Sequence, residues 1–207
     1  MSEPDTRRSI NLALQGGGPH GALTWGVLDA LLEDGEIAFD SISGASAGAM
    51  NAVAVAHGFA QAAQQYHDPD DVRQAGADLA RATLTRLWEG TGAMGSMAWS
   101  APLSQVFPGL AMMTPWLAPA QVNPLDINPL RDLLEREVDF DVLAASSAAP
   151  KVFVCATNVR TGHGEIFSGA RLTADAVMAS ACLPLVFKAV EIGGDAYWDG
   201  CYSGNPP

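Results

Sequence analysis

The sequence has little positive charge. Among its 207 residues, 11 are Lys or Arg and 23 are Asp or Glu, which gives a formal net charge of −12 and an isoelectric point near 4.5. Binding of nucleic acid depends on clustered Lys and Arg, and docking on anionic lipid needs a basic patch. This composition excludes nucleic acid as a partner and leaves only hydrophobic or transient contact with a lipid surface.

Cysteines and long apolar runs are also scarce. The three cysteines, Cys155, Cys182 and Cys201, have no zinc-type spacing and are expected to be reduced thiols of a cytoplasmic protein. Residues 1–8 are polar and lead into a short apolar run followed by glycines, unlike a signal sequence. No stretch approaches the ~20 apolar residues that a spanning helix requires. We therefore expect a soluble chain that is unprocessed at this end.

Apolar residues make up 48% of the chain, enough for one sizeable core. The pattern of apolar residues predicts strands at 9–15, 39–43, 151–157 and 165–168, helices at 20–33, 45–58, 70–88, 129–137 and 173–182, and a hairpin over 190–198. Alternating strands and helices are typical of an α/β sheet covered by helices. We expect one α/β domain over residues 9–207, preceded by a polar tail over 1–8.

Residues 90–126 interrupt this pattern with five prolines and many methionines and tryptophans. Long apolar loops of this kind are typical of lids or binding loops, and methionine adapts well to acyl chains of different shape. Ordinary packing beneath a long loop explains the pattern about as well. The candidate acyl-chain contacts are Met94, Met97, Trp99, Met112, Met113 and Trp116.

Two glycine-rich turns carry candidate chemistry. Residues 15–21 read Gln-Gly-Gly-Gly-Pro-His-Gly, which fits either a dinucleotide pyrophosphate or a row of bare N–H groups facing an oxyanion. Residues 44–48 read Gly-Ala-Ser-Ala-Gly at a strand-to-helix junction, which is the pattern of a nucleophile elbow around Ser46. Taken alone, the second motif is as compatible with a plain glycine-rich turn.

The position of the acidic residues decides between a dinucleotide site and an ester hydrolase. A dinucleotide site needs a carboxylate at the end of the second strand, but Asp34, Glu36 and Asp40 all precede that end. A serine stands there instead. In a hydrolase the first turn would supply oxyanion donors, with Gly17 and Gly18 favoured because Pro19 has no N–H, and the second turn would supply the nucleophile.

No histidine has the place along the chain that is expected of a base that activates Ser46. None of the four histidines follows the later acids, as an α/β-hydrolase triad requires. Asp199 ends a predicted strand between an aromatic residue and glycine, where desolvation can make a carboxylate a general base. From spacing alone, an aspartate that caps a turn is the better explanation.

Four motifs together resemble the patatin-like phospholipase family: residues 16–21, residues 44–51, residues 179–184, and Asp199-Gly200 with Asn205-Pro206. The resemblance runs from about residue 9 to the C-terminus and implies a three-layer α/β/α fold. It further implies a lipid or acyl-ester hydrolase of the phospholipase A, lysophospholipase or esterase type, without histidine, metal or cofactor. By this resemblance Ser46 is the nucleophile, Asp199 the base, and Gly16, Gly17 and Gly18 form the oxyanion hole.

The chain departs from the family in three ways. Cys201 stands where the family has Gly or Ala, and Pro19 stiffens the first turn. Family members also continue well past the Asp-Gly motif, so we expect a fragment or cleaved product whose exposed apolar surface would favour homo-oligomers. These departures leave open an alternative, a catalytically inert lipid-binding or interaction domain of the same fold.

Overall fold

The computed structural model describes residues 8–100, 128–184 and 187–207. The helices are α1 (Gly21–Asp34), α2 (Ala47–Gln65), α3 (Pro69–Ser100), α7 (Pro129–Glu137), α8 (Phe140–Ala145) and α9 (Ala174–Ser180), with 3-10 turns η1 (Gly18–His20), η3 (Gly169–Arg171) and η4 (Gly200–Tyr202). The strands are β1 (Arg8–Leu14), β2 (Ile37–Gly44), β3 (Lys151–Asn158), β4 (Gly164–Phe167), β5 (Val190–Ile192) and β6 (Asp195–Asp199). Within the described residues, no helix is both long and apolar enough to cross a membrane.

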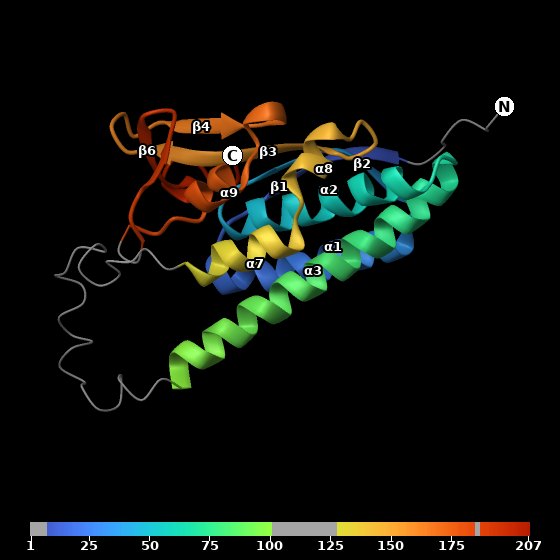
Figure 1. The fold of residues 1–207 in the computed structure, drawn as a ribbon, viewed down its shortest axis with the longest axis horizontal. Coiled ribbons are helices and arrows are strands. Elements are labelled where there is room, and N and C mark those ends of the chain that lie inside the picture. Colours follow the sequence, from blue (N-terminus) through green and yellow to red (C-terminus); the bar gives the residue numbers. More distant parts are fainter. Residues whose placement is uncertain (1–7, 101–127, 185–186) are drawn as a thin grey trace.

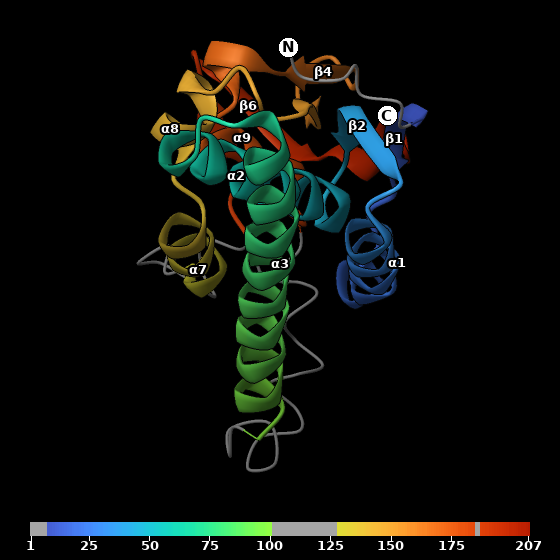
Figure 2. The ribbon, with the colours of Figure 1, turned by 90° about the vertical axis from the view of Figure 1, so that its right-hand side faces the viewer.

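The strands form one mixed sheet in which β1 pairs with β2, β2 with β3, β3 with β6 and β6 with β5, and β4 also pairs with β3. β1, β2 and β3 run parallel, whereas β4, β5 and β6 join antiparallel. Helices lie on both sides of the sheet, which confirms the predicted three-layer α/β/α fold. Figures 1 and 2 show α2 next to the sheet, with α3 packed outside it between α1 and α7.

The register along β3 places the ends of two other strands against each other. β2 pairs with β3 up to Gly44 opposite Val154, and β6 pairs with it from Asp199 opposite Ala156. β4 pairs with β3 across the same stretch, from Val154 to Thr157. Because a strand has only two edges, β2 and β6 must share the edge that β4 leaves open. The carboxyl ends of β2 and β6 therefore point toward each other.

Small residues let α2 lie close to both the sheet and α3. Every residue of α2 from Ala47 to Gly58 is buried, and a Cβ added to Gly58 would come within 2.2 Å of the backbone nitrogen of Ala80 in α3. Such close contact excludes larger side chains from this layer. The helix also continues to Gln65, beyond the predicted end at Gly58, because its apolar alanines keep packing against the core.

Helix α3 continues well past the end predicted at Trp88 and runs to Ser100. The prediction took Gly90 as the start of a loop. Instead, a Cβ on Gly90 would meet Leu133 Cδ1 at 2.7 Å, so this glycine makes room for α7. The helix continues because no proline interrupts it before Pro102. The prediction also missed α8, whose first turn is capped by the side chain of Asp139.

His57 is a buried polar residue on α2. Its side chain is only 2% exposed, and its Nε2 accepts a hydrogen bond from the backbone N–H of Asp139 at 3.1 Å. Within the described residues its Nδ1 has no hydrogen-bond partner. Burial is the main cause that lowers the pKa of His57 from 6.5, with Asp139 and Glu137 opposing the shift and Arg86 adding to it.

We expect His57 to make the fold sensitive to acid. A histidine whose pKa is lowered in the folded state binds its proton mainly after unfolding, so stability is full above pH 6.5 and falls as the pH drops below it. The loss amounts to at most about 1.4 kcal/mol per pH unit for one group. Thermal unfolding between pH 7.5 and 5 should show a steeper loss for the wild type than for His57→Gln, which retains an acceptor for Asp139. Parallel curves for the two proteins would contradict this assignment.

Candidate active site

Ser46 sits on a strained turn between β2 and α2. Its φ of 55° is the only positive value at a non-glycine residue among the described residues, and its ψ is −123°. A side chain in this region of φ/ψ space costs about 1–3 kcal/mol and is held there by its surroundings. The backbone N–H of Ser46 donates to Ser180 Oγ at 2.9 Å, a buried contact from α9 that helps to hold the turn.

Close contacts explain both glycines of the Ser46 turn. A Cβ on Gly44 would lie 2.5 Å from the carbonyl of Gly48, and a Cβ on Gly48 would lie 2.3 Å from the carbonyl oxygen of Leu14. Real Cβ atoms do not approach backbone atoms this closely, so any larger residue would separate β1, β2 and α2. The Gly-x-Ser-x-Gly spacing is thus required by packing at this junction and not only by the turn.

Asp199 is the last residue of β6 and is 2% exposed. Its backbone N–H donates to the carbonyl of Cys182 at 2.9 Å, and its backbone carbonyl accepts from Thr157 Oγ1 at 2.8 Å. Its carboxylate oxygen Oδ1 accepts the N–H of Cys201 at 2.9 Å. The main chain is therefore fixed on both sides of the carboxylate, and one of the two carboxylate oxygens has a defined donor.

Ser46 and Asp199 line the same cleft, which has a volume of about 430 Å³. We call it the Ser46–Asp199 cleft; its lining residues are Gly16, Gly17, Gly18, Pro19, Ser46, Leu183, Asp199, Cys201, Tyr202 and Asn205. The cleft forms where the carboxyl ends of β2 and β6 approach each other along β3. Packing at Gly200 confirms the close approach, because a Cβ there would lie 2.1 Å from the carbonyl oxygen of Cys155 and 3.1 Å from Ala45 Cβ.

The glycine turn after β1 forms one wall of the Ser46–Asp199 cleft. The N–H of Gly16 donates to Asn205 Oδ1 at 2.7 Å, and Asn205 Nδ2 donates back to the carbonyl of Gly16 at 3.1 Å. Gly16 is therefore held in place, and its amide is engaged by the protein itself. Among the described residues, neither the N–H of Gly17 nor that of Gly18 donates a hydrogen bond.

Three supporting groups were not assigned by sequence reasoning. Ser180 holds the Ser46 turn, the carbonyl of Cys182 holds Asp199, and Asn205 holds Gly16. All three belong to motifs that carried the family resemblance, but no local pattern indicates what they contact. Their partners lie far away in sequence, so only the folded chain shows their roles.

Of the predicted acyl-chain residues, Met94 is the one whose side chain the structure describes, and it does not line the Ser46–Asp199 cleft. Met94 is half-buried on α3. Met97 and Trp99 belong to the same helix, but their side chains fall outside what the structure describes, as do the whole residues Met112, Met113 and Trp116. The assignment of residues 90–126 as a lid or binding loop stays a prediction.

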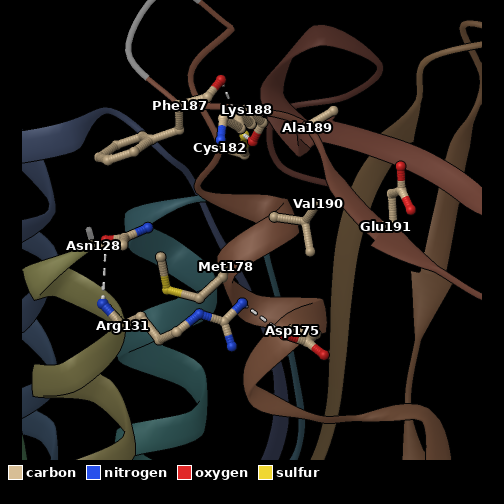
Figure 3. Close-up of a pocket in the computed structure, with 10 residues that line it drawn as sticks. All are labelled: Asn128, Arg131, Asp175, Met178, Cys182, Phe187, Lys188, Ala189, Val190 and Glu191. Atoms are coloured by element: carbon tan, nitrogen blue, oxygen red, sulfur yellow. Dashed lines mark hydrogen bonds and ion pairs between the residues drawn. The ribbon is translucent and has the colours of Figure 1, made fainter. Parts of the chain in front are cut away.

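A second and larger cavity has a volume of about 560 Å³. Leu183, which lines the cleft, directly follows Cys182, which lines the larger cavity. Figure 3 shows Met178 and Val190 between the pair Arg131–Asp175 and the segment at Phe187. Arg131 Nη2 contacts Asp175 Oδ1 at 2.6 Å. Sequence reasoning assigned no function to any residue of this cavity.

The fold and the cleft define the class of protein: an α/β domain with a serine on a strained strand-to-helix turn, a buried carboxylate beside it, and a glycine turn with free amides. The chain belongs to the patatin-like phospholipase family, whose model matches residues 12–207. Proteins of this family usually hydrolyse lipid esters. The resemblance drawn from the sequence motifs is thereby confirmed.

Two further comparisons complete this result. Comparison with curated proteins finds no match. Among solved structures, VipD from Legionella pneumophila is similar, with 19% sequence identity and a TM-score of 0.48. The match covers 99% of this chain and 47% of VipD, so the chain spans about half the length of that protein.

Proposed function

We propose that this protein is a lipid acyl hydrolase of the phospholipase A, lysophospholipase or esterase type, with Ser46 as nucleophile and Asp199 as base. The observation that carries the proposal is the meeting of these two side chains in one cleft. Ser46 is presented by a strained turn at the start of a long buried helix, where the helix dipole favours developing negative charge.

The proposed reaction proceeds in two half-reactions. Asp199 accepts the proton of the Ser46 hydroxyl as Oγ attacks the ester carbonyl, and the N–H groups of Gly17 and Gly18 bind the resulting oxyanion. The tetrahedral intermediate collapses to an acyl-serine, and the departing alcohol takes the proton from Asp199. Asp199 then removes a proton from water, which attacks the acyl-serine; Ser46 Oγ leaves, takes the proton back from Asp199, and the fatty acid is released. Each oxyanion donor contributes roughly 3 kcal/mol to transition-state stabilisation.

The rim of the cleft suits an apolar substrate. Leu183 and Tyr202 line it and are 47% and 65% exposed, which leaves apolar surface at the entrance. Among the described lining residues there is no Lys, Arg or His. With a net charge of −12, contact with a lipid surface would depend on these apolar side chains and not on attraction to anionic headgroups.

A fluorophosphonate probe tests the proposal directly, because an activated serine oxygen displaces its fluoride and becomes covalently phosphonylated. We expect labelling of the wild-type chain and none of Ser46→Ala, read by mass spectrometry of the intact protein. Ser41→Ala is the matched control, since Ser41 lies earlier on β2 and bonds to Asn11; this variant should label like the wild type. Equal labelling of all three proteins, or of none, would refute the enzyme and favour an inert lipid-binding domain.

A further inference from the structure

The side chains that line the Ser46–Asp199 cleft offer no partner to a negatively charged headgroup. Among the described lining residues, Asp199 is acidic and there is no Lys, Arg or His. A phosphate that leaves water needs charge-assisted hydrogen bonds, since an unpaired anion is costly to bury. The backbone N–H groups of Gly17 and Gly18 bind the oxyanion in the proposed reaction, so they cannot hold a headgroup at the same time.

Most arginines of the described chain are already engaged by carboxylates. An arginine in an ion pair would have to give up its partner before it could meet a substrate. None of the residues in this group lines the Ser46–Asp199 cleft. The arginines that form an ion pair with an Asp or Glu side chain are Arg73, Arg81, Arg86, Arg131, Arg136, Arg160 and Arg171.

The other described Lys and Arg residues lie away from the cleft. Arg8 begins β1, a strand of 7 residues, and the glycine turn follows the opposite end of that strand, about 20 Å further along. Lys151 and Lys188 line two other cavities, and Figure 3 shows Lys188 in the larger of these. The histidine nearest along the chain, His20, is exposed; its Nδ1 lies 3.0 Å from the carbonyl oxygen of Gly17, and it does not line the cleft.

The rest of the sequence supplies almost no positive charge. Outside the described ranges, Arg7 is the one basic residue, and residues 101–127 and 185–186 contain no Lys, Arg or His. The whole chain has a net charge of −12, so its summed field repels anions before they reach the cleft. An anionic substrate would therefore meet repulsion at long range and no counter-charge on arrival.

We propose that the substrate of this cleft is an acyl ester whose alcohol carries no phosphate, such as a monoacylglycerol. The inference rests on the proposed function and narrows it to uncharged esters. In the reaction given above, the bond between the acyl carbon and the glycerol oxygen breaks, and glycerol leaves with the proton from Asp199. The exposed apolar rim at Leu183 and Tyr202 suits the acyl chain of such an ester.

The test compares monooctanoylglycerol with monooctanoylglycerol phosphate, which share the ester and the acyl chain, each below its aggregation concentration. Both release octanoic acid, so one fatty-acid assay gives kcat/KM for each. At about pH 8, where histidine is neutral, the full wild-type chain should prefer the uncharged ester by about 10-fold or more, the value of one charge-assisted hydrogen bond. Raising the salt from about 0.02 M to about 0.5 M should raise the rate for the phosphate ester alone.

Two arginine variants locate the origin of this preference. Tyr202→Arg places a cation at the rim of the cleft and should reduce the preference for the uncharged ester by about 5-fold. Tyr66→Arg is the matched control, because Tyr66 is 42% exposed and follows the end of α2 opposite Ser46, across a helix of 19 residues. That helix is about 28 Å long, so the same added charge should leave the preference within about 2-fold of the wild type.

Three results would count against the proposal. Equal kcat/KM for the two esters at low salt, or a faster phosphate ester, would overturn the substrate class and leave the Ser46–Asp199 pair intact. An equal effect of both arginine variants would overturn it as well, because the preference would then come from net charge and not from the cleft. A wild-type chain that hydrolyses neither ester and resists the fluorophosphonate would refute the pair, and the substrate class with it.

Discussion

Replacing Asp199 with asparagine should lower kcat/KM for ester hydrolysis by roughly 10²- to 10⁴-fold, the range expected when a general base is lost. Asparagine keeps the size of the side chain and an oxygen that can accept the Cys201 N–H, so the local structure should survive. The amide cannot take the proton of the Ser46 hydroxyl. Initial rates with a soluble acyl ester, measured beside thermal unfolding, would separate loss of the base from loss of the fold.

Two further variants test whether the loss of activity is specific to Asp199 and whether Asp199 acts together with Ser46. Asp195→Asn changes a carboxylate on the same strand, where it pairs with Arg160 at 3.2 Å on the surface; such pairs contribute at most about 1 kcal/mol, so activity should be retained. The double variant Ser46→Ala with Asp199→Asn should be no slower than either single variant, because residues that act as one unit are not additive. Additive losses would show that the two residues act independently.

Replacing Gly48 with alanine should destabilise the fold by about 3 kcal/mol or more, which is the upper range for overpacking in a core. The new Cβ would lie 2.3 Å from the carbonyl oxygen of Leu14 and 2.9 Å from that of Gln15. Both are backbone atoms that cannot move aside alone, so α2 must move away from β1. For a chain of this length the melting temperature should fall by about 10 °C, measured by calorimetry or circular dichroism.

Gly26→Ala is the matched control for Gly48→Ala. Gly26 lies within α1, is exposed, and a Cβ there meets no atom within 4 Å. Alanine is a better helix former than glycine, so this variant should be stabilised by about 0.5–1 kcal/mol. Equal melting temperatures for the Gly48 variant and the wild type would show that the junction of β1 and α2 is looser than these contacts indicate.

Much of the secondary structure follows from local pattern. The helix predicted over 129–137 coincides with α7, because Asn128 caps it and Pro129 occupies its first turn. Gly35 follows the helix predicted over 20–33 and ends α1 in the left-handed conformation. The errors lie where packing overrides local preference. The prediction began a loop at Gly90, but the missing side chain of this glycine admits Leu133 and the helix continues.

Of the two candidate catalytic residues, only Ser46 could be predicted from a local sequence pattern. The Ser46 turn has a local signature, since two glycines and a serine must fit one tight junction. Asp199 has none: its spacing alone favoured a turn cap, and only the family resemblance identified it as the base. The structure also gives Gly16 a different place from Gly17 and Gly18, because its amide is bonded to Asn205.

By itself, the sequence determined the α/β class, the family and the serine turn, since each depends on residues close together along the chain. Only the tertiary structure decided that β2 and β6 share one edge of β3 and bring Ser46 into one cleft with Asp199. It also decided that Cys201 contacts the carboxylate and that Asn205 holds Gly16. Strand pairing between distant segments is set by the packing of the whole sheet, which no local pattern encodes.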